Sequence, residues 1–468
     1  MSDHAPLATA RQRGEVVPLF VIDPYFFAPE RARELPHRMQ FLLESVESLA
    51  RNLEALGSRL LLVRGRSIEV VPRLVKEWNI DRVVAHRWTE PFARERDARV
   101  AEALRVPFEL FEGETMLKPG TLRTQSGTPF SVFTPFSRAF RKSVSVSKPL
   151  PTPKALPPIP SDITHAAVSL PTLRDLGISH NPRLTPGGER ASNERLKAFL
   201  ANGATAYRAE RDRMDHAGTS RLSQDLKFGT LSATKVWSSV QALRARLGNE
   251  GPEGITTFEN ELLWREFAHY SMWERPDLMS KPFRPEFQGF PWGFDEAFWG
   301  AWTNGYTGYP VVDASARQLL RDGFVHNRAR MISASFLTKH LLIDYKRGEA
   351  HYMKWLTDGD WAQNNAGWQW SAGCGCDAQP YFRVFNPVTQ GERFDPEGDY
   401  VREFVPELRE LPAKVIHAPW TADPSVLSRA GITLGKNYPR PIVDHAAART
   451  KFLSLAKNHL RAPSGAHE

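Results

Sequence analysis

VVPLFVI, from Val16 to Ile22, is a continuous apolar run, which is the pattern of a strand buried on both faces of a parallel sheet. Three more short runs of this kind follow it, at RLLLVRG (Arg59–Gly65), RVVAHR (Arg82–Arg87) and FELFEG (Phe108–Gly113). The intervening segments carry apolar residues at helical spacing, over Leu35–Leu56, Val71–Trp78 and Phe92–Leu104. Strands and helices that alternate in this way predict a doubly wound parallel α/β domain over residues 1–115. No G-x-G-x-x-G motif follows any of these runs, so a dinucleotide-binding fingerprint is absent from them.

The rest of the chain divides into a connector and a helical part. KPLPTPKALPPIPSD (Lys148–Asp162) is too rich in proline for a helix and predicts an extended spacer, within an interdomain linker of residues 116–190. From about Ala191 to the end, apolar residues recur at three- and four-residue steps, as in ENELLWREFAHYSMW (Glu259–Trp273). We therefore expect an all-helical domain over residues 191–468, joined to the α/β domain by the linker.

Composition limits the classes of function. The chain has 468 residues, enough for two or three domains, and no stretch approaches the roughly 18 apolar residues of a membrane span. The first residues lack the apolar core of a secretory signal. The two cysteines, Cys374 and Cys376, fit a reducing cytoplasm and indicate packing in a tight turn rather than a metal site. A net charge of +8, with 13 Trp and 27 Phe, suits a polyanionic partner and stacking on bases or on a flat cofactor.

Seven motifs occur in order along the chain: AYRAERD (Ala206–Asp212), GTSRLSQDLKFGTLS (Gly218–Ser232), NELLWREF (Asn260–Phe267), TGYPVVDASARQL (Thr307–Leu319), HNRARMISASFLTKHLL (His326–Leu342), DGDWAQNNAGWQW (Asp358–Trp370) and YPRPIVDH (Tyr438–His445). In this order they resemble the photolyase/cryptochrome flavoproteins, most of all the bacterial cyclobutane pyrimidine dimer DNA photolyases. The resemblance covers nearly the whole chain. It implies a carbon–carbon lyase that carries FAD, acts on ultraviolet-damaged DNA and needs no metal.

The resemblance implies a set of FAD contacts, of which the GTSRLS loop would hold the phosphates. Hydroxyls and unpaired N–H groups at a helix start bind anions, although an ordinary N-cap explains the same residues. Arg330 would pair with Asp358 beside the flavin ring, where a purely structural ion pair is the alternative. Asn364 matches the residue that faces flavin N5. The full set is Tyr207, Thr219, Ser220, Arg221, Leu222, Ser223, Phe258, Arg265, Arg330, Asp358, Gly359, Asp360 and Asn364.

The resemblance also implies a pocket for a flipped-out dimer. Trp264 and Trp370 would form its two walls by stacking, and Glu261, one helical turn before Trp264, matches the carboxyl that hydrogen-bonds the pyrimidine carbonyl. Asn327 and Met331 are typical of enzymes for cyclobutane dimers rather than (6-4) photoproducts. Alone, a Glu and a Trp at this spacing indicate an ordinary amphipathic surface. The residues expected to contact DNA are Glu261, Trp264, Asn327, Arg211, Arg328, Arg383 and Gln390.

Two features depart from the family's pattern. The aromatic chain that re-reduces the flavin usually has three tryptophans, and here Trp368 and Trp292 flank Tyr345 in the middle position. A tyrosine loses its phenolic proton on oxidation, so either photoreduction slows or another tryptophan, Trp355 or Trp361, takes over. The chain also begins after the place of the family's first strand, which would leave an unpaired interior edge in the sheet; a shortened gene start is the simplest account.

We therefore expect light-dependent repair of cyclobutane pyrimidine dimers by a cytoplasmic monomer. A folate antenna stays open, because Trp88 and Glu90 lie where the family binds an antenna while the short N-terminus removes part of the usual site. One alternative is a cryptochrome-type blue-light photoreceptor, although only a short tail follows YPRPIVDH. A second is a nucleic-acid-binding protein that has lost its flavin, against which the GTSRLS and DGD motifs argue.

Overall fold

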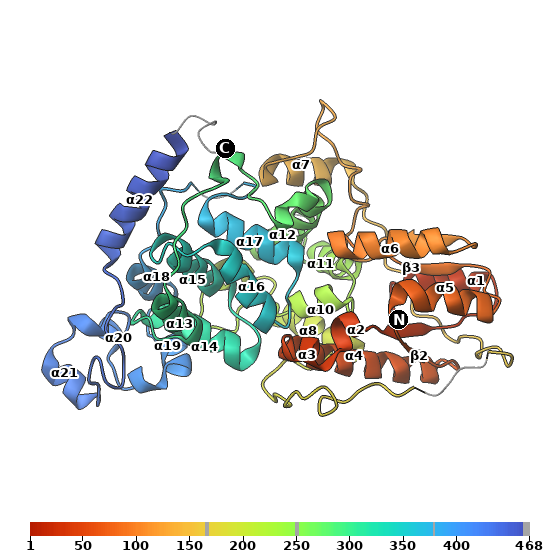
Figure 1. Ribbon diagram of the computed structural model, residues 1–468, viewed down its shortest axis with the longest axis horizontal. Coiled ribbons are helices and arrows are strands. Elements are labelled where there is room, and N and C mark those ends of the chain that lie inside the picture. Colours follow the sequence, from red (N-terminus) through yellow and green to blue (C-terminus); the bar gives the residue numbers. More distant parts are fainter. Residues whose placement is uncertain (164–167, 249–251, 378–379, 462–468) are drawn as a thin grey trace. The chain divides into compact units, whose positions relative to one another are not determined.

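A computed structural model describes residues 1–163, 168–248, 252–377 and 380–461, and Figure 1 shows the course of the chain. The chain divides into two compact units. Unit 1 comprises Met1–Arg208, Ser220–Pro276 and Thr357–Ala362. Unit 2 comprises Ala209–Thr219, Asp277–Leu356 and Gln363–Glu468. Because the chain passes between them several times, each unit contains residues from distant parts of the sequence.

The strands of unit 1 lie where the apolar runs predict them. Strand β1 (Leu19–Ile22) pairs in parallel with β2 (Leu61–Arg64), and β3 (Val83–His86) pairs in parallel with β4 (Phe108–Phe111). Helices α4 (Pro36–Ala55), α5 (Ser67–Glu77) and α6 (Pro91–Ala103) alternate with them, so the predicted α/β alternation is confirmed. Within the described residues the strands form two separate two-stranded sheets rather than one continuous sheet. Helix α1 (Ala5–Gln12) packs against β3 and β4.

Unit 1 also contains helices from the later sequence. These are α8 (Glu189–Asn202), α10 (Ser223–Phe228), α11 (Ala233–Leu247) and α12 (Glu253–Glu274). Most side chains of α12 are buried, which explains why its sequence shows apolar residues on more than one face. Helix α7 (Phe133–Ser143) lies within the segment predicted as a linker, whose residues 164–167 are outside the described part. The proline-rich stretch Lys148–Asp162 contains neither helix nor strand, as predicted.

Unit 2 is helical, and its core gathers buried aromatic and aliphatic side chains. Its central helices are α13 (Glu296–Asn304), α14 (Pro310–Asp322), α15 (Asn327–Lys339), α16 (Tyr345–Trp355) and most of α17 (Trp361–Ala372). The buried carboxylate of Asp313 accepts hydrogen bonds from Thr307 N (2.7 Å) and Tyr438 Oη (2.7 Å), which joins two of the sequence motifs. Gly348 packs against Trp368, since a Cβ there would lie 2.2 Å from the indole.

The remaining helices are short, apart from the last. They are α2 (Pro24–Phe27), α3 (Pro29–Arg33), α9 (Tyr207–Glu210), α18 (Pro387–Phe394), α19 (Asp399–Phe404), α20 (Ala413–Ile416), α21 (Pro424–Arg429) and α22 (His445–Arg461), with 3₁₀ turns at Pro276–Met279, Pro285–Phe287, Pro406–Leu408 and Pro419–Thr421. Among the helices of the described ranges, none is long and apolar enough to cross a bilayer. The C-terminal residues 462–468 lie outside the description.

Candidate functional site

The predicted phosphate loop leads into helix α10 of unit 1. Arg221 adopts a left-handed backbone conformation, with φ of +54°, which is strained for a residue with a side chain. Leu222 occupies the N-cap position and makes no side-chain cap hydrogen bond. The alternative of an ordinary side-chain N-cap is therefore wrong for this helix. In unit 2, Gly218 lies so close to Glu210 that a Cβ would fall 2.5 Å from the Glu210 Cβ, which explains why the loop begins with glycine.

Two predicted FAD contacts, Tyr207 and Phe258, lie together in unit 1. Their rings meet edge to face at 5.2 Å, and both are nearly buried. Arg265 is also buried, and its Nη1 donates to Glu114 O at 2.5 Å. Its Nε has no hydrogen-bond partner among the described residues. A buried guanidinium N–H without a partner is costly, so this atom is suited to bind an acceptor on a ligand.

The DGD motif carries two buried carboxylates, Asp358 and Asp360, around Gly359. The Arg38 side chain, from α4, packs directly on this glycine, where a Cβ would lie 2.3 Å from Arg38 Nη2. Burial lowers the pKa of Arg38 to about 10, and the carboxylates of Glu90, Asp358 and Asp360 oppose that shift. The guanidinium therefore stays charged at neutral pH. A side chain at position 359 would have to displace the end of the Arg38 side chain.

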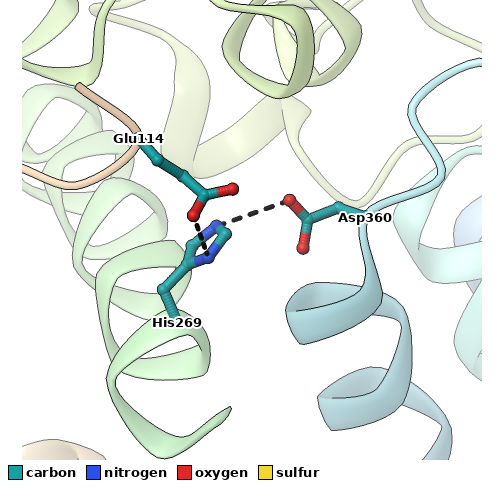
Figure 2. A group of neighbouring side chains, drawn as sticks. All are labelled: Glu114, His269 and Asp360. Carbon is teal, nitrogen blue, oxygen red and sulfur yellow. Dashed lines mark ion pairs between the residues drawn. The ribbon is translucent and has the colours of Figure 1, made fainter. Parts of the chain in front are cut away.

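A buried histidine lies between two carboxylates in unit 1. His269 Nδ1 is 3.6 Å from Glu114 Oε2, and His269 Nε2 is 3.4 Å from Asp360 Oδ2 (Figure 2). The Thr89 hydroxyl is 2.7 Å from both Glu114 Oε2 and His269 Nδ1. Because the hydroxyl donates its one proton to the carboxylate, it accepts from Nδ1–H, which assigns the tautomer. His269 Nε2 and Asp360 Oδ2 make no hydrogen bond within the described residues, and burial lowers the pKa of His269.

Lys227 adds a positive charge to the same region. Its Nζ lies 2.5 Å from Glu90 Oε1 and 4.0 Å from Asp360 Oδ2, and it stands 4.6 Å from the centre of the Trp88 ring. Burial acts to lower the pKa of Lys227, but the carboxylates of Glu90 and Asp360 outweigh it and raise that pKa. Trp88 and Glu90, the residues predicted near an antenna, thus both contact this ammonium group.

The predicted substrate residues Glu261 and Trp264 lie on α12 in unit 1. The Trp264 indole stacks on Phe133 of α7 with 3.7 Å between ring centres and an interplanar angle of 7°. Phe267 meets the same indole edge-on at 6.0 Å. One face of the tryptophan is therefore held flat before any ligand binds. Stacking of this kind prepares an indole to receive a base on its other face.

In unit 2, one residue orients both asparagines at the start of α17. Asn364 Nδ2 donates to the backbone carbonyl of Glu349 at 3.0 Å, and Asn365 Nδ2 donates to the Glu349 carboxyl at 3.0 Å. A carbonyl can only accept, so this bond fixes which end of the Asn364 amide is the NH₂ group. Its Oδ1 remains as the acceptor, as the predicted contact to a protonated flavin N5 requires. Trp368 is buried, and Trp370 is half-buried on the same helix.

Several other predicted residues of unit 2 contact one another or a neighbouring acidic side chain. Asn327 and Met331 meet on one face of α15, with Nδ2 3.7 Å from the sulfur. Arg328 donates to Asp212 at 2.8 Å and lies over the Phe394 ring, and Arg211 is 3.9 Å from Asp212.

Arg330 Nε donates to Val325 O at 2.8 Å, and its predicted pairing with Asp358, which belongs to unit 1, stays a prediction. Arg383 is exposed, and Gln390 is half-buried on α18. Thr219 is half-buried, and Ser220 and Ser223 are likewise half-buried in unit 1.

Comparison with known proteins decides the family. Residues 1–155 match the DNA photolyase model, and residues 258–458 match the model for the FAD binding domain of DNA photolyase. A deoxyribodipyrimidine photo-lyase of Agrobacterium fabrum is 38% identical over 97% of this chain and 95% of its own length. The chain belongs to the DNA photolyase family.

Solved structures agree with this membership. A class III photolyase from Agrobacterium tumefaciens superposes with a TM-score of 0.88 at 37% identity, covering 98% of this chain and 95% of that one. A Synechocystis cryptochrome superposes with a TM-score of 0.89 at 29% identity, covering 96% of each chain. The predicted photolyase/cryptochrome fold is confirmed, and it is shared by this photolyase and this cryptochrome.

The residues present fit FAD, the cofactor of this family. In unit 1 the start of α10 lacks a side-chain cap and Arg265 has a buried N–H without a partner. In unit 2 Asn364 has its amide oriented with the oxygen as acceptor. The negative diphosphate suits the first two features, because unpaired N–H groups at a helix start and a guanidinium both bind anions. The individual contacts stay predictions.

Several residues in these networks escaped prediction from the sequence. Lys227 lies inside the quoted GTSRLSQDLKFGTLS motif, and its helical position four residues after Ser223 was the available signal. Arg38, Phe133, His269 and Glu349 carry no local pattern that separates them from ordinary helix residues. Their roles arise from contacts with residues that are distant in the sequence.

Replacing Glu349 by Gln should change how stability depends on pH. Burial raises the pKa of the Glu349 carboxyl from 4.5 to about 7, so its contribution to stability is present in full below pH 4.5 and is lost as the pH rises through 7. Glutamine keeps an acceptor for Asn365 but has no such titration. Urea unfolding measures the free energy of unfolding of both proteins at pH 5 and pH 8. The value for the variant minus the value for wild type should be about 2 kcal/mol higher at pH 8 than at pH 5. If the difference in free energy of unfolding between variant and wild type were the same at both pH values, the raised pKa of the buried Glu349 carboxyl would be contradicted.

Replacing His269 by Leu should destabilise the folded protein by about 3 kcal/mol, because Asp360 and Glu114 would then face a buried apolar group. Thermal or urea unfolding measures the loss. Arg190→Ala is the control, since Arg190 pairs with Glu194 on the exposed surface and such pairs contribute little. Equal effects of both substitutions would show that the ring does not stabilise the two carboxylates.

Proposed function

We propose that this chain is a deoxyribodipyrimidine photo-lyase that splits cyclobutane pyrimidine dimers in DNA by light-driven electron transfer from reduced FAD. The relatives named deoxyribodipyrimidine photo-lyase match nearly its whole length. The observation that carries the proposal is the arrangement on α12. There, Glu261 stands one turn before a tryptophan that Phe133 already holds flat.

Each group has a distinct task in this proposal. Trp264 and Trp370 stack on the flipped-out dimer and exclude water from it. Glu261 hydrogen-bonds a pyrimidine carbonyl and stabilises the charge that develops there. Asn327 and Met331 complete the pocket. When bound and reduced, FAD supplies under light the electron that opens the ring and recovers it afterwards.

Binding to DNA rests on the positive surface. Arg383 is exposed, and Arg211 and Arg328 share the carboxylate of Asp212. Because Asp212 neutralises part of their charge, we propose that Arg383 makes the stronger phosphate contact and that the other two exchange Asp212 for a phosphate. Such contacts give affinity without sequence preference.

Other parts of the proposal are less specific. Cys374 and Cys376 form no disulfide, which supports a reducing compartment, and we propose that the protein acts in the cytoplasm as a monomer. A folate antenna at Trp88 and Glu90 would have to exchange their contacts with Lys227.

The alternative is a blue-light photoreceptor, which the similarity to a cryptochrome keeps in view. The two functions place different demands on the proposed dimer-binding pocket. A photoreceptor needs the flavin but does not need residues that bind a pyrimidine dimer. The complete set of Glu261, Trp264, Trp370, Asn327 and Met331 favours repair.

The test uses FAD-loaded protein, reduced in the dark and mixed with a duplex that carries one thymine dimer. Under blue light, Glu261→Ala should slow dimer loss about tenfold or more, because the carboxyl stabilises the reacting base. Trp264→Ala should weaken binding to the dimer about tenfold, which is the loss of one stacked base.

Glu253→Ala is the matched control for this test, because it removes an exposed carboxylate from the same helix. FAD content and melting temperature show that each variant is folded. Equal rates in Glu261→Ala and Glu253→Ala would refute the assigned pocket. A folded, yellow wild-type protein without repair would favour the photoreceptor.

A further inference from the structure

A histidine and two carboxylates meet in the interior of unit 1. The side chains of His269, Asp360 and Glu114 are 0%, 1% and 7% exposed. One donor atom from each lies within 4.8 Å of the donors of the other two, and His269 lies between the two carboxylates (Figure 2). Imidazole and carboxylate groups are ligands of transition-metal ions, so this group has the composition of a metal site.

The hydrogen bonds around His269 leave a lone pair on its Nε2. The Thr89 hydroxyl gives its proton to Glu114 Oε2 and accepts the proton of His269 Nδ1. Burial lowers the pKa of His269, which favours the neutral ring. Its Nε2 is buried, has no hydrogen-bond partner among the described residues and lies 3.4 Å from Asp360 Oδ2. A lone pair therefore faces a carboxylate oxygen, and a cation between them would remove their repulsion.

The Glu114 carboxylate has one oxygen held in place and one available. Its Oε2 accepts from the backbone N–H and the hydroxyl of Thr89, both at 2.7 Å. Its Oε1 is buried and has no hydrogen-bond partner among the residues described. In metal sites the ring N–H of a histidine ligand is usually held by a further polar group, which fixes the direction of the other nitrogen. Thr89 holds His269 in this way.

The distance between donors indicates which ion fits. A hydrogen bond between charged groups spans about 2.7–2.9 Å, which is shorter than the 3.4 Å between His269 Nε2 and Asp360 Oδ2. Two ligands of a tetrahedral Zn²⁺ ion, each with a bond of about 2.1 Å, lie roughly 3.4 Å apart. Imidazole suits Zn²⁺, whereas Mg²⁺ and Ca²⁺ prefer oxygen ligands alone. The Glu114 donor lies within 4.8 Å of both, so a turn of its carboxyl closes the site.

The neighbouring cations leave negative charge on these carboxylates to be balanced. Lys227 Nζ lies 2.5 Å from Glu90 Oε1 but 4.0 Å from Asp360 Oδ2, so its ammonium pairs mainly with Glu90. Arg265 Nη1 donates to the backbone carbonyl of Glu114 at 2.5 Å. A divalent cation matches the two negative charges of Glu114 and Asp360, and buried charges are tolerated when they are paired in this way.

We propose that Glu114 Oε1, His269 Nε2 and Asp360 Oδ2 bind a structural Zn²⁺ ion, with a water molecule as its fourth ligand. The ion joins α12, the loop that follows β4 and the DGD segment. Asp360 keeps its other oxygen for the proposed FAD contact. No step of the proposed repair uses the ion, so the site is independent of the proposed function.

The test measures zinc in FAD-loaded wild-type protein that has been stripped with a chelator, equilibrated with Zn²⁺ and desalted. We expect one zinc ion per chain by mass spectrometry. X-ray absorption at the zinc edge should show one imidazole, with nitrogen and oxygen ligands at about 2.0–2.2 Å. No retained zinc, more than one imidazole, or sulfur at about 2.3 Å would overturn the site, because sulfur ligands would come from Cys374 or Cys376.

Variants locate the ion. His269→Gln and Glu114→Gln each remove one ligand and should weaken Zn²⁺ binding at least about tenfold in a competition titration. His216→Gln is the matched control: its Nδ1 lies 2.6 Å from Glu210 and its Nε2 3.8 Å from Asp215, but this histidine is exposed. The control should bind Zn²⁺ like wild type. Equal affinity in all four proteins, or loss in the control alone, would mean an adventitious ion only.

Stability gives a readout that needs neither light nor DNA. Excess Zn²⁺ should raise the melting temperature of the stripped wild-type protein by about 3 °C or more, and Mg²⁺ should not. The increase should be absent in Glu114→Gln, whose FAD content shows that it is folded even if His269→Gln is not. An equal increase in Glu114→Gln and wild type would overturn the site. A protein that binds zinc here without splitting dimers would refute the proposed function alone.

Discussion

The contact of Glu349 with the asparagine pair is the constraint on which the proposed contact of Asn364 with the flavin depends. Its backbone carbonyl fixes the Asn364 amide and its carboxyl fixes that of Asn365, so one residue of α16 orients the beginning of α17. Gly348, its neighbour, lets Trp368 approach the same helix. The Asn364 amide and the Trp368 ring are thus both positioned by two consecutive residues of α16.

Unit 1 meets a different requirement, which is to keep several charges buried near the DGD motif. Arg38 and Lys227 lie among the carboxylates of Asp358, Asp360, Glu90 and Glu114, which oppose the effect of burial on the pKa values of the two cations. Buried charges are tolerated only when they are paired, so the group acts as a unit and removal of one member exposes the rest to an uncompensated field.

The fold and much of the candidate site could be predicted because they leave local or ordered signals in the sequence. Apolar runs identified the four strands, and the seven motifs identified the family. The separation of the strands into two pairs depends on pairing between distant segments, which no run of residues displays. Phe133, Glu349 and His269 act through contacts across space.

Light-dependent repair is tested most directly by one flash on the dark-reduced holoprotein bound to DNA that carries a single dimer. The account predicts that dimers are converted to intact bases and that the absorption of the flavin returns to that of the reduced enzyme, because the electron is recovered. A flash that leaves every dimer intact, or that leaves the flavin oxidised for each dimer lost, would contradict it.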